Sequence, residues 1–315
     1  YVLPATSCDL PALTDGTWSV SAKLSDPAGN QSSAGTSLSM VVDGTAPSAP
    51  GLPDVAAASD SGTSSTDNNT SDTTPTMSAT GGSNGDTMTF TATNGGTTKT
   101  CSYVLPATSC DLPALTDGTW SVSATLTDPA GNVSPASAAL PLVVDTTAPS
   151  APVAPDLVAA SDTGSSSTDD LTSDNTPAMS LPGATSGDTV TFTATSGATT
   201  KTCSYVAGSA SSCDLPALTD GTWSVTAKVT DPAGNQSTAG PALALTVDSA
   251  APSAPGAVDL LASSDTGSSS TDNVTSDTTP AVSATGGSSG DTMTFTATNG
   301  STTVSCSYVL PATSC

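Results

Sequence analysis

The sequence predicts an all-β chain built from a row of similar sandwich domains, and three observations support this prediction. One stretch, CDLPALTDGTWSVSATLTDPAGN, occurs three times in nearly the same form. Its copies begin at Cys8, Cys110 and Cys213, so one copy recurs about every 100 residues, which is the size of one sandwich domain. All 28 acidic residues are Asp and the chain has no Glu or Arg, so it lacks the usual material of surface helices.

The repeated stretch contains the strand that anchors each domain. Apolar residues alternate there with small polar residues; in the second copy the apolar positions are Trp120, Val122, Ala124 and Leu126. A period of two is typical of a strand with one buried face. Turn-forming residues stand at both of its ends, in Asp117-Gly118 and in the segment from Asp128 to Asn132. We therefore predict one buried strand between two turns in every copy.

The register of the copies divides the chain into two complete repeats between two partial ones. The C-terminal part of a repeat occupies residues 1–43, complete repeats occupy 44–145 and 146–248, and the N-terminal part of another occupies 249–315. Each repeat opens with spaced prolines, such as Pro47 and Pro50. Proline keeps the backbone extended and cannot pair as an inner strand, so we interpret these openings as short, stiff linkers.

The repeat 44–145 shows how the other strands follow in order. A first strand is expected near 53–58, then a long polar segment at 59–72, a short strand at 76–80, a clear strand at 86–93, the cysteine hairpin, the Trp120 strand and a last strand at 138–144. In the strand at 86–93, Met88, Phe90 and Ala92 alternate with threonines and are expected to face inward. About seven strands in about 100 residues indicate an immunoglobulin-like sandwich.

Composition limits the partners. The net charge is −24, and the only basic residues are four lysines. Phosphate binding depends on Lys and Arg, so nucleic acid is not expected as a partner, and an anionic membrane surface would repel the chain. No apolar run approaches the roughly 20 residues that span a bilayer. The expected partners are neighbouring repeats of the same chain and, as an alternative, identical chains.

The cysteines fall in close pairs. The pairs are Cys101 with Cys110, Cys203 with Cys213, and Cys306 with Cys315, and Cys8 stands alone. Two cysteines that flank a hairpin tip can form a cross-strand disulfide, which indicates export to an oxidising compartment. Metal ligation and disulfides between chains are the alternatives. Metal ligation is disfavoured because each repeat offers two sulfurs and no His.

Recurring carboxylates predict a calcium site. Clustered carboxylates repel one another and need a compensating cation, and calcium takes oxygen ligands from such polar loops. The candidate ligands of the first joint are Asp60, Asp67, Asp72, Asp117 and Asp145 of one repeat with Asp188, Asp231 and Asn235 of the next. The equivalent candidates one repeat later are Asp162, Asp169, Asp174 and Asp248.

The expected position of this calcium is the joint between consecutive repeats. In an immunoglobulin-type order, the loop after the first strand and the end of the last strand share one pole, and the turn after the Trp strand lies at the other. Head-to-tail stacking would bring these segments together. The spacing does not match an EF-hand, because the closing Glu is absent. The alternative interpretation is that each Asp caps a turn or solubilises the surface.

Other chemistry has little support in the sequence. No His exists to activate a serine, and paired Asp repeated in every copy fits a structural role better than glycoside hydrolysis, so we expect no enzyme activity. Trp18, Trp120 and Trp223 could stack on sugars, but each lies on the apolar face of its strand. We therefore expect them in the core.

Several motifs in the right order resemble the bacterial immunoglobulin-like repeats of giant surface adhesins. These are Asp145 to Pro149, Ser161 to Asp169, Asp117 to Trp120, and Asp128 to Asn132. The resemblance implies a calcium-stiffened extracellular stalk that sets a binding module away from the cell. Two features depart from the family: the cysteine pairs, and Trp120 at a corner where related sandwiches place a Tyr whose hydroxyl makes the corner hydrogen bond.

Two functional expectations follow. The first is a passive extracellular rod or stalk in a cell-surface adhesin, with calcium at its joints. The alternative is a self-assembling fibre or sheath in which repeats also contact neighbouring chains. An elongated monomer favours the first, and lateral contacts that bury more than about 1,000 Å² per pair favour the second.

Overall fold

The structure, a computed structural model, describes residues 7–164 and 166–315. These residues form strands, turns and loops, so the predicted all-β class is confirmed. The chain divides into two compact units, Tyr1–Val247 and Asp248–Cys315. In the part of the chain that is described, no helix is long and apolar enough to cross a membrane.

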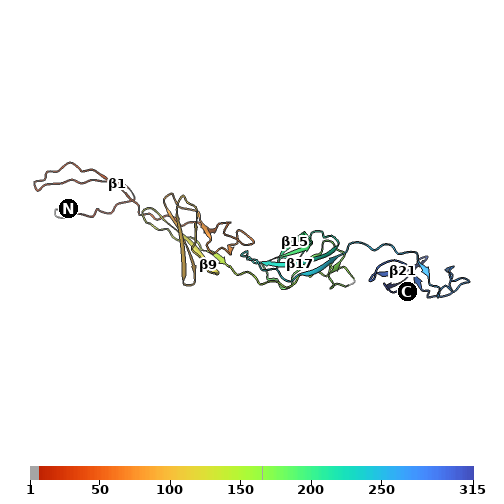
Figure 1. Cartoon of the computed structure of the whole chain (residues 1–315). Helices are drawn as coiled ribbons and strands as arrows, with labels where there is room; N and C mark the ends of the chain where they lie inside the picture. Colours follow the sequence, from red (N-terminus) through yellow and green to blue (C-terminus); the bar gives the residue numbers. More distant parts are fainter. Residues whose placement is uncertain (1–6, 165) are drawn as a thin grey trace. The chain divides into compact units, whose positions relative to one another are not determined.

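The first complete repeat is a sandwich of two sheets (Figure 1). Its strands are β3 (Asp54–Val55), β4 (Asn69–Thr70), β5 (Thr76–Ser78), β6 (Thr87–Asn94), β7 (Thr97–Val104), β8 (Cys110–Asp111), β9 (Gly118–Thr127) and β10 (Leu140–Val144). One sheet has the order β4-β10-β9-β6-β7, and the other has the order β3-β5-β8. The anchoring strand β9 lies in the middle of the larger sheet, where it pairs antiparallel with both β6 and β10.

The second complete repeat has the same topology. Its strands are β11 (Asp156–Leu157), β12 (Leu171–Thr172), β13 (Ala178–Ser180), β14 (Thr189–Ser196), β15 (Thr199–Val206), β16 (Ser212–Asp214), β17 (Gly221–Thr230) and β18 (Leu243–Val247). Its sheets have the orders β12-β18-β17-β14-β15 and β11-β13-β16. Equivalent strands thus occupy equivalent places in both repeats.

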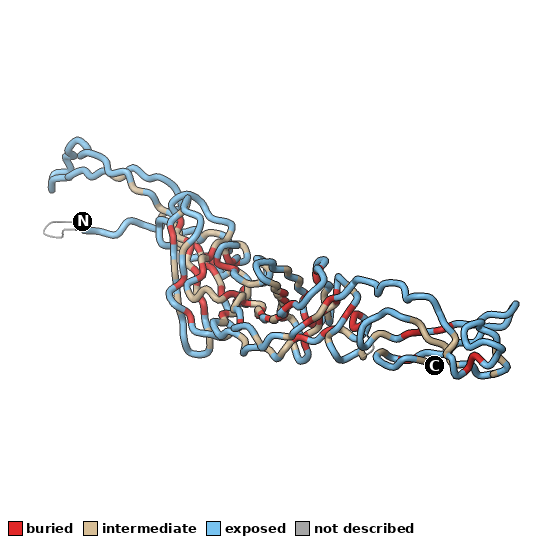
Figure 2. The backbone as a smooth tube through the Cα atoms, turned by 45° about the vertical axis from the view of Figure 1, so that its right-hand side comes forward, coloured by how far each residue is buried: buried red, intermediate tan, exposed pale blue. Residues whose placement is uncertain are grey.

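The partial repeats form small sheets. Strands β1 (Gly16–Val20) and β2 (Leu38–Val42) pair with each other near the N-terminus. In the unit Asp248–Cys315, β19 (Asp259–Leu260) pairs with β20 (Val282–Ser283), and β21 (Thr292–Asn299) pairs with β22 (Thr302–Val309). Most residues from 7 to 43 are exposed, whereas buried segments run through both complete repeats (Figure 2). Trp18 on β1 is 37% exposed, so the expectation that it lies in a core is wrong, because β1 and β2 form only a two-stranded sheet in the described residues.

Each complete repeat has its own hydrophobic core between its two sheets. The fully buried side chains of the first core include Met77, Met88, Phe90, Ala92, Trp120, Val122, Ala124, Leu126 and Leu142. The period-two pattern of the sequence had predicted most of these positions. The threonines that alternate with them on β6 are half-buried or, at Thr93, exposed, as expected for the outer face.

Trp120 closes the corner before β9. Its side chain is 1% exposed, and its Nε1–H donates a hydrogen bond to the Thr116 carbonyl oxygen at 2.9 Å. Trp223 repeats this bond to Thr219 at the same distance. In related sandwiches a Tyr hydroxyl bonds the backbone a few residues upstream. The indole N–H supplies the corner hydrogen bond here, which the resemblance alone did not predict.

The predicted cysteine pairs are disulfides, but their placement differs from the expected hairpin. The bonds join Cys101 to Cys110, Cys203 to Cys213, and Cys306 to Cys315, and Cys8 is free and exposed. Cys101 lies in β7 of the larger sheet, and Cys110 lies in β8 of the smaller sheet. The chain crosses from one sheet to the other between the two cysteines. The disulfide therefore bridges the sheets of the sandwich and does not join paired strands.

Candidate functional site

Hydroxyl side chains hold the long polar loop, residues 59–72, in one conformation. The Thr70 hydroxyl donates to the Ser59 carbonyl oxygen, and the Ser71 amide donates to Ser61 Oγ at 2.9 Å. The Ser59 hydroxyl in turn accepts from the Thr76 amide at 3.1 Å. Equivalent bonds recur in the later repeats, for example from Thr172 to the Ser161 carbonyl oxygen. The loop contributes strand β4, which its polar composition did not predict.

Asp60 lies beneath this loop with one carboxylate oxygen unpartnered. The residue is 4% exposed, and its Oδ2 accepts from the Asn68 amide at 3.2 Å. Asn68 has a φ of 60°, a left-handed conformation that Asn tolerates. Asp60 Oδ1 is buried and accepts no hydrogen bond, and the same is true of Oδ1 in Asp162 and Asp265. A buried, unpaired carboxylate oxygen is costly, so its recurrence in three repeats needs an explanation.

The surroundings of Asp60 are acidic. Burial raises the pKa of its carboxyl group above the ordinary value of 3.8, and the carboxylates of Asp67 and Asp54 raise it further. In the second repeat, burial likewise raises the pKa of Asp170, with additional contributions from Asp162, Asp156 and Asp169. We call the groups around Asp60, Asp162 and Asp265 the loop pockets. Within the described residues, no three acidic side chains converge closely enough to form a metal site by themselves. A cation in a loop pocket would therefore take part of its ligands from carbonyl groups and water.

Asp72 and Asp174 cap turns. Asp72 Oδ1 accepts from the Thr74 amide at 2.8 Å and from the Thr74 hydroxyl at 3.1 Å. Asp174 repeats both bonds with Thr176, at 2.9 and 3.1 Å. These contacts match the turn-capping interpretation that the sequence had left open.

Asp117 and Asp145 hold the start of the next linker. The Asp117 carboxylate accepts from the Thr146 hydroxyl at 2.8 Å and from the Thr147 hydroxyl at 3.1 Å. The bond from Thr146 is the main cause of the lowered pKa of Asp117. Asp145 Oδ1 accepts from the Thr147 amide at 2.9 Å, and Asp248 accepts likewise from the Ala250 amide at 3.1 Å.

In both complete repeats, an asparagine ties the turn after the anchoring strand to the end of the preceding repeat. Asp231 accepts from the amide and the side chain of Asn235, at 2.9 and 3.0 Å. Asn235 Nδ2 also donates to the Asp145 carbonyl oxygen at 2.7 Å. At the preceding joint, Asn132 Nδ2 donates to the Asp43 carbonyl oxygen at 3.0 Å. The predicted meeting of Asp145, Asp231 and Asn235 thus occurs through the main-chain oxygen of Asp145.

The polar loop of the first repeat lies directly on this turn of the second. Ser61 Oγ donates to the Ala233 carbonyl oxygen at 3.2 Å, and the Thr63 amide donates to the Pro232 carbonyl oxygen at 3.3 Å. A Cβ added to Gly62 would lie 1.9 Å from the Pro232 oxygen. Sequence reasoning missed Ser61 and Gly62, although a glycine recurs two residues after each loop-pocket Asp, at Gly164 and Gly267.

Gly62→Ala is expected to open this joint at a cost of about 1–3 kcal/mol, because the added methyl group would overlap a backbone oxygen that cannot move freely. Hydrogen exchange of the Thr63 amide measures the opening. Gly164→Ala is the matched control. In both variants the added Cβ would lie 3.1 Å from a carbonyl oxygen of its own loop. This oxygen belongs to Asn69 for Gly62 and to the equivalent Leu171 for Gly164. Equal exchange of Thr63 in the two variants would contradict the contact with Pro232.

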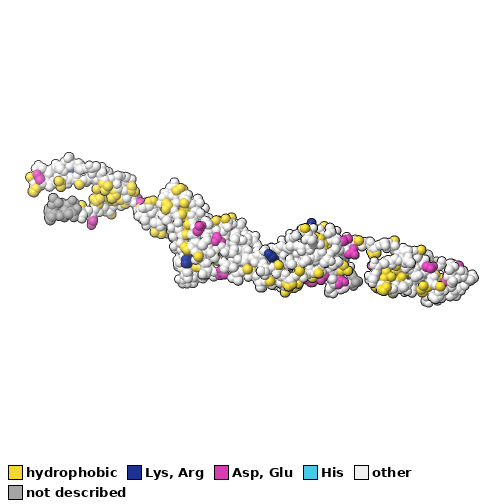
Figure 3. All heavy atoms as spheres, in the orientation of Figure 1, with side chains coloured by type: hydrophobic (Ala, Val, Ile, Leu, Met, Phe, Trp, Pro, Cys, Tyr) yellow, Lys and Arg dark blue, Asp and Glu magenta, His cyan; other side chains and the backbone are white. Residues whose placement is uncertain are grey.

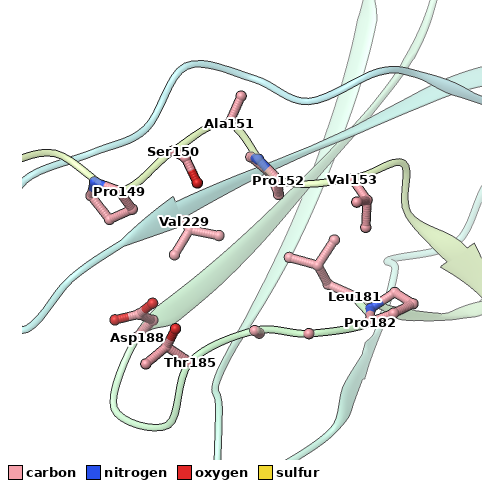
Figure 4. Close-up of a pocket in the computed structure, with 12 residues that line it drawn as sticks. Pro149, Ser150, Ala151, Pro152, Val153, Leu181, Pro182, Thr185, Asp188 and Val229 are labelled. Carbon is pink, nitrogen blue, oxygen red and sulfur yellow. The ribbon is translucent and has the colours of Figure 1, made fainter.

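Asp188 lies apart from the loop pockets, beside the linker of its own repeat. It is 8% exposed, and burial raises the pKa of its carboxyl group, with a further contribution from Asp231. Figure 4 shows its carboxylate at one end of a hollow of about 290 Å³ that is lined by Pro149, Pro152 and Val229. On the face shown in Figure 3, acidic side chains form small separate groups, and few lysines are visible. That face carries no basic patch.

Comparisons with known proteins identify the family of these repeats. The family model described as "Bacterial Ig-like domain" matches residues 46–146 and 148–249. No curated protein matches the chain. A Ca2+-stabilized adhesin of an Antarctic bacterium that binds ice is 22% identical, with 95% of this chain and 73% of that chain covered and a TM-score of 0.31. A 1.5-MDa bacterial ice-binding adhesin is 21% identical, with 84% of each chain covered and a TM-score of 0.29. The FN1–FN3 domains of chicken CNTN1 are 11% identical, with 71% and 76% covered and a TM-score of 0.39. Because the family model covers more than half of the sequence, the chain belongs to the bacterial Ig-like domain family.

Proposed function

We propose that this chain is the repeat region of a bacterial cell-surface adhesin, a structural stalk whose loop pockets bind calcium. Family membership and the tandem repeats support a spacer role, because similar units that follow one another along the chain suit a common structural task. The inter-sheet disulfides support an oxidising location outside the cytoplasm.

The unpartnered Oδ1 atoms of Asp60, Asp162 and Asp265 carry the calcium proposal. Each belongs to a carboxylate that is more than nine-tenths buried beneath a loop of Asp, Asn, Ser and Thr residues. Calcium prefers six to eight oxygen ligands, including carboxylates, main-chain carbonyl groups and water. Asp60 and Asp67 would supply negative charge in the first pocket, and calcium would neutralise their mutual repulsion.

Calcium in a loop pocket would stiffen the joint through the loop itself. The loop that covers Asp60 also carries Ser61, Gly62 and Thr63, which contact the turn of the next repeat. An ion that fixes Asp60 and Asp67 would reduce the conformational freedom of the intervening residues. The proposed role at the joint is therefore indirect, because the ion lies inside one repeat and orders the loop that reaches the other.

Adding calcium to the metal-free chain is expected to raise its Tm in differential scanning calorimetry. At about a hundred times the Kd, a bound ligand adds about 2.7 kcal/mol to the free energy of unfolding of each repeat. The triple variant Asp60→Asn, Asp162→Asn, Asp265→Asn should lose this rise. The matched control, Asp9→Asn, Asp111→Asn, Asp214→Asn, removes the same charge from exposed positions and should keep it. An equal rise in both variants would place calcium elsewhere.

The response to pH provides a second measurement in the same experiment. The raised pKa of Asp60 means that its contribution to stability in the metal-free chain is present below the ordinary value of 3.8 and is lost as the pH rises through the folded value. Calcium binds the ionised form, so protons compete with it. The calcium-dependent rise in Tm should therefore be smaller at about pH 4 than at about pH 7.

A further inference from the structure

The linker of the second repeat lies further from the neighbouring loop than the linker of the first. A Cβ added to Gly81 would lie 3.4 Å from the Cα of Pro50. At the equivalent Gly183 an added Cβ would meet no atom of the described residues within 4 Å. The hollow of about 290 Å³ beside Asp188 lies between the linker and this loop, and we call it the linker hollow.

Two residue differences account for this separation. In the first repeat the Gly51 amide donates to the Thr80 carbonyl oxygen at 2.9 Å, and a Cβ added to Gly51 would overlap Thr80 Oγ1. So close an approach requires glycine. Val153 and Pro182 occupy the equivalent positions of the second repeat, and in the described part of the chain no hydrogen bond joins them. The sequence of the second repeat thus keeps its linker away from the loop.

The Asp188 carboxylate is buried without a hydrogen-bond partner. The residue is 8% exposed, and within residues 7–164 and 166–315 no hydrogen bond ends on its side chain. At the equivalent positions, Asp86 Oδ2 accepts from the Ser83 amide at 2.8 Å, and Asp291 Oδ2 accepts from the Ser288 amide at 2.7 Å. A buried carboxylate without donors is costly. Asp188 is therefore suited to a ligand that brings both positive charge and N–H donors.

The other walls of the linker hollow combine hydroxyl groups with hydrocarbon. Figure 4 shows the Ser150 hydroxyl directed into the hollow from the linker, and the Thr185 hydroxyl on the side of the carboxylate. The ring of Pro152 and the side chain of Val229 provide apolar surface. Among the described residues that line the hollow, none is basic. The hollow thus offers a carboxylate, two hydroxyl groups and an apolar wall.

We propose that the linker hollow binds a primary alkylammonium group, which is a protonated amine on an aliphatic stem. The three N–H donors of the amine match the Asp188 carboxylate and the hydroxyls of Ser150 and Thr185, and the stem packs on the apolar wall. Calcium fits less well, because it takes six to eight oxygen ligands and part of the lining is hydrocarbon. The volume is close to the lower limit of small-ligand sites, about 300 Å³.

The charge of the surroundings also favours a cation. The carboxylate of Asp231 is near enough to contribute to the raised pKa of Asp188, and the net charge of the whole chain is −24. The inference goes beyond the spacer role and does not depend on calcium in the loop pockets. A stalk with this site would bind ligands along its length in addition to acting as a spacer. The ammonium group can come from a free diamine or polyamine, or from a lysine side chain of another protein.

Titration of the isotope-labelled full chain with n-butylammonium chloride, followed by two-dimensional NMR, tests the proposal. The amide signals of Gly187 and Asp188 should shift and saturate, and those of Gly85 and Asp86 should shift little. The alcohol n-butanol has the same stem without the charge and should leave all four signals in place. Equal shifts with the alcohol would overturn the proposal.

Two further ligands distinguish the sources of the amine. Putrescine represents the free diamines, and Nα-acetyl-lysine N-methylamide presents a lysine side chain on a peptide backbone. Saturable binding of either one supports the proposal and identifies the source. No shift with butylammonium, putrescine or the lysine derivative overturns it. So does a chain in which calcium shifts the Gly187 and Asp188 signals and butylammonium does not.

Variants locate the site. Asp188→Asn should weaken butylammonium binding by about tenfold or more, because the ligand loses its bond to a charged acceptor. Its Tm should stay at or above the parental value, since no hydrogen bond within the chain is lost. The matched control Asp86→Asn removes the same charge from the equivalent position of the first repeat and should keep the parental affinity.

Equal weakening in both variants, or none in either, overturns the proposal. If Asp188→Asn does not fold, Ser150→Ala changes an exposed linker residue and should still weaken butylammonium binding. Parental affinity in that variant would then overturn the proposal.

Discussion

Replacing Trp120 with alanine is expected to lower the free energy of unfolding of the first complete repeat by about 3–5 kcal/mol. The side chain is 1% exposed and packs between the two sheets, so its removal leaves a cavity that the surrounding strands cannot fill. Calorimetry, in which the transition of the first repeat moves while that of the second stays in place, measures the loss. A change below about 1 kcal/mol would contradict the buried position.

Trp120→Phe separates packing from hydrogen bonding. Phenylalanine keeps most of the aromatic surface but has no donor for the Thr116 carbonyl oxygen. This variant should lose less than the alanine variant and still lose about 1 kcal/mol or more, since a carbonyl group loses its partner. Trp223 lies in the same environment in the second repeat, and it serves as an unchanged internal reference.

Replacing Cys101 and Cys110 with alanine is expected to lower the stability of the first repeat by about 2–4 kcal/mol. The bond closes a short loop and also holds β7 of one sheet to β8 of the other. Strand β7 is an edge strand of its sheet, and β8 has only two residues, so few other contacts keep these segments together. Calorimetry of the oxidised chain measures the loss.

The second repeat again provides the control, since Cys203 and Cys213 form the equivalent bond in the same chain. In the alanine variant the transition of the first repeat should move to lower temperature, and that of the second should stay close to its original position. Addition of a reductant should then bring the second transition down as well. Unchanged transitions in the alanine variant would show that the bond adds nothing to the sandwich.

The sequence predicted most of the sandwich because its core strands have strong local patterns. Met88, Phe90 and Ala92 are buried where the alternation placed them, and so are Leu140, Leu142 and Val144. The short strand β4 could not be predicted, because Asn69 and Thr70 have no apolar alternation. Their partner strand is β10, which lies more than 60 residues away in the sequence, so no local pattern could indicate the pairing.

The sequence predicted which residue types form the candidate site, but it did not predict how they are arranged. The recurring Asp residues indicated cation binding, but Asp60, Asp72 and Asp117 look alike in sequence. In the structure, Asp60 is buried with one unpaired oxygen, while Asp72 and Asp117 accept bonds from nearby threonines. Burial and the neighbouring donors separate these roles, and neither can be read from the spacing of the residues.

The all-β class, the repeat length, the inward-facing residues and the cysteine pairs follow from the sequence alone, because alternation and repetition can be recognised without knowledge of the fold. The folded structure is needed to show which sheets the disulfides join, which carboxylate is buried and which strands pair in parallel. These properties depend on residues distant in sequence, whose contacts arise from packing of the complete sandwich and not from the preferences of any one segment.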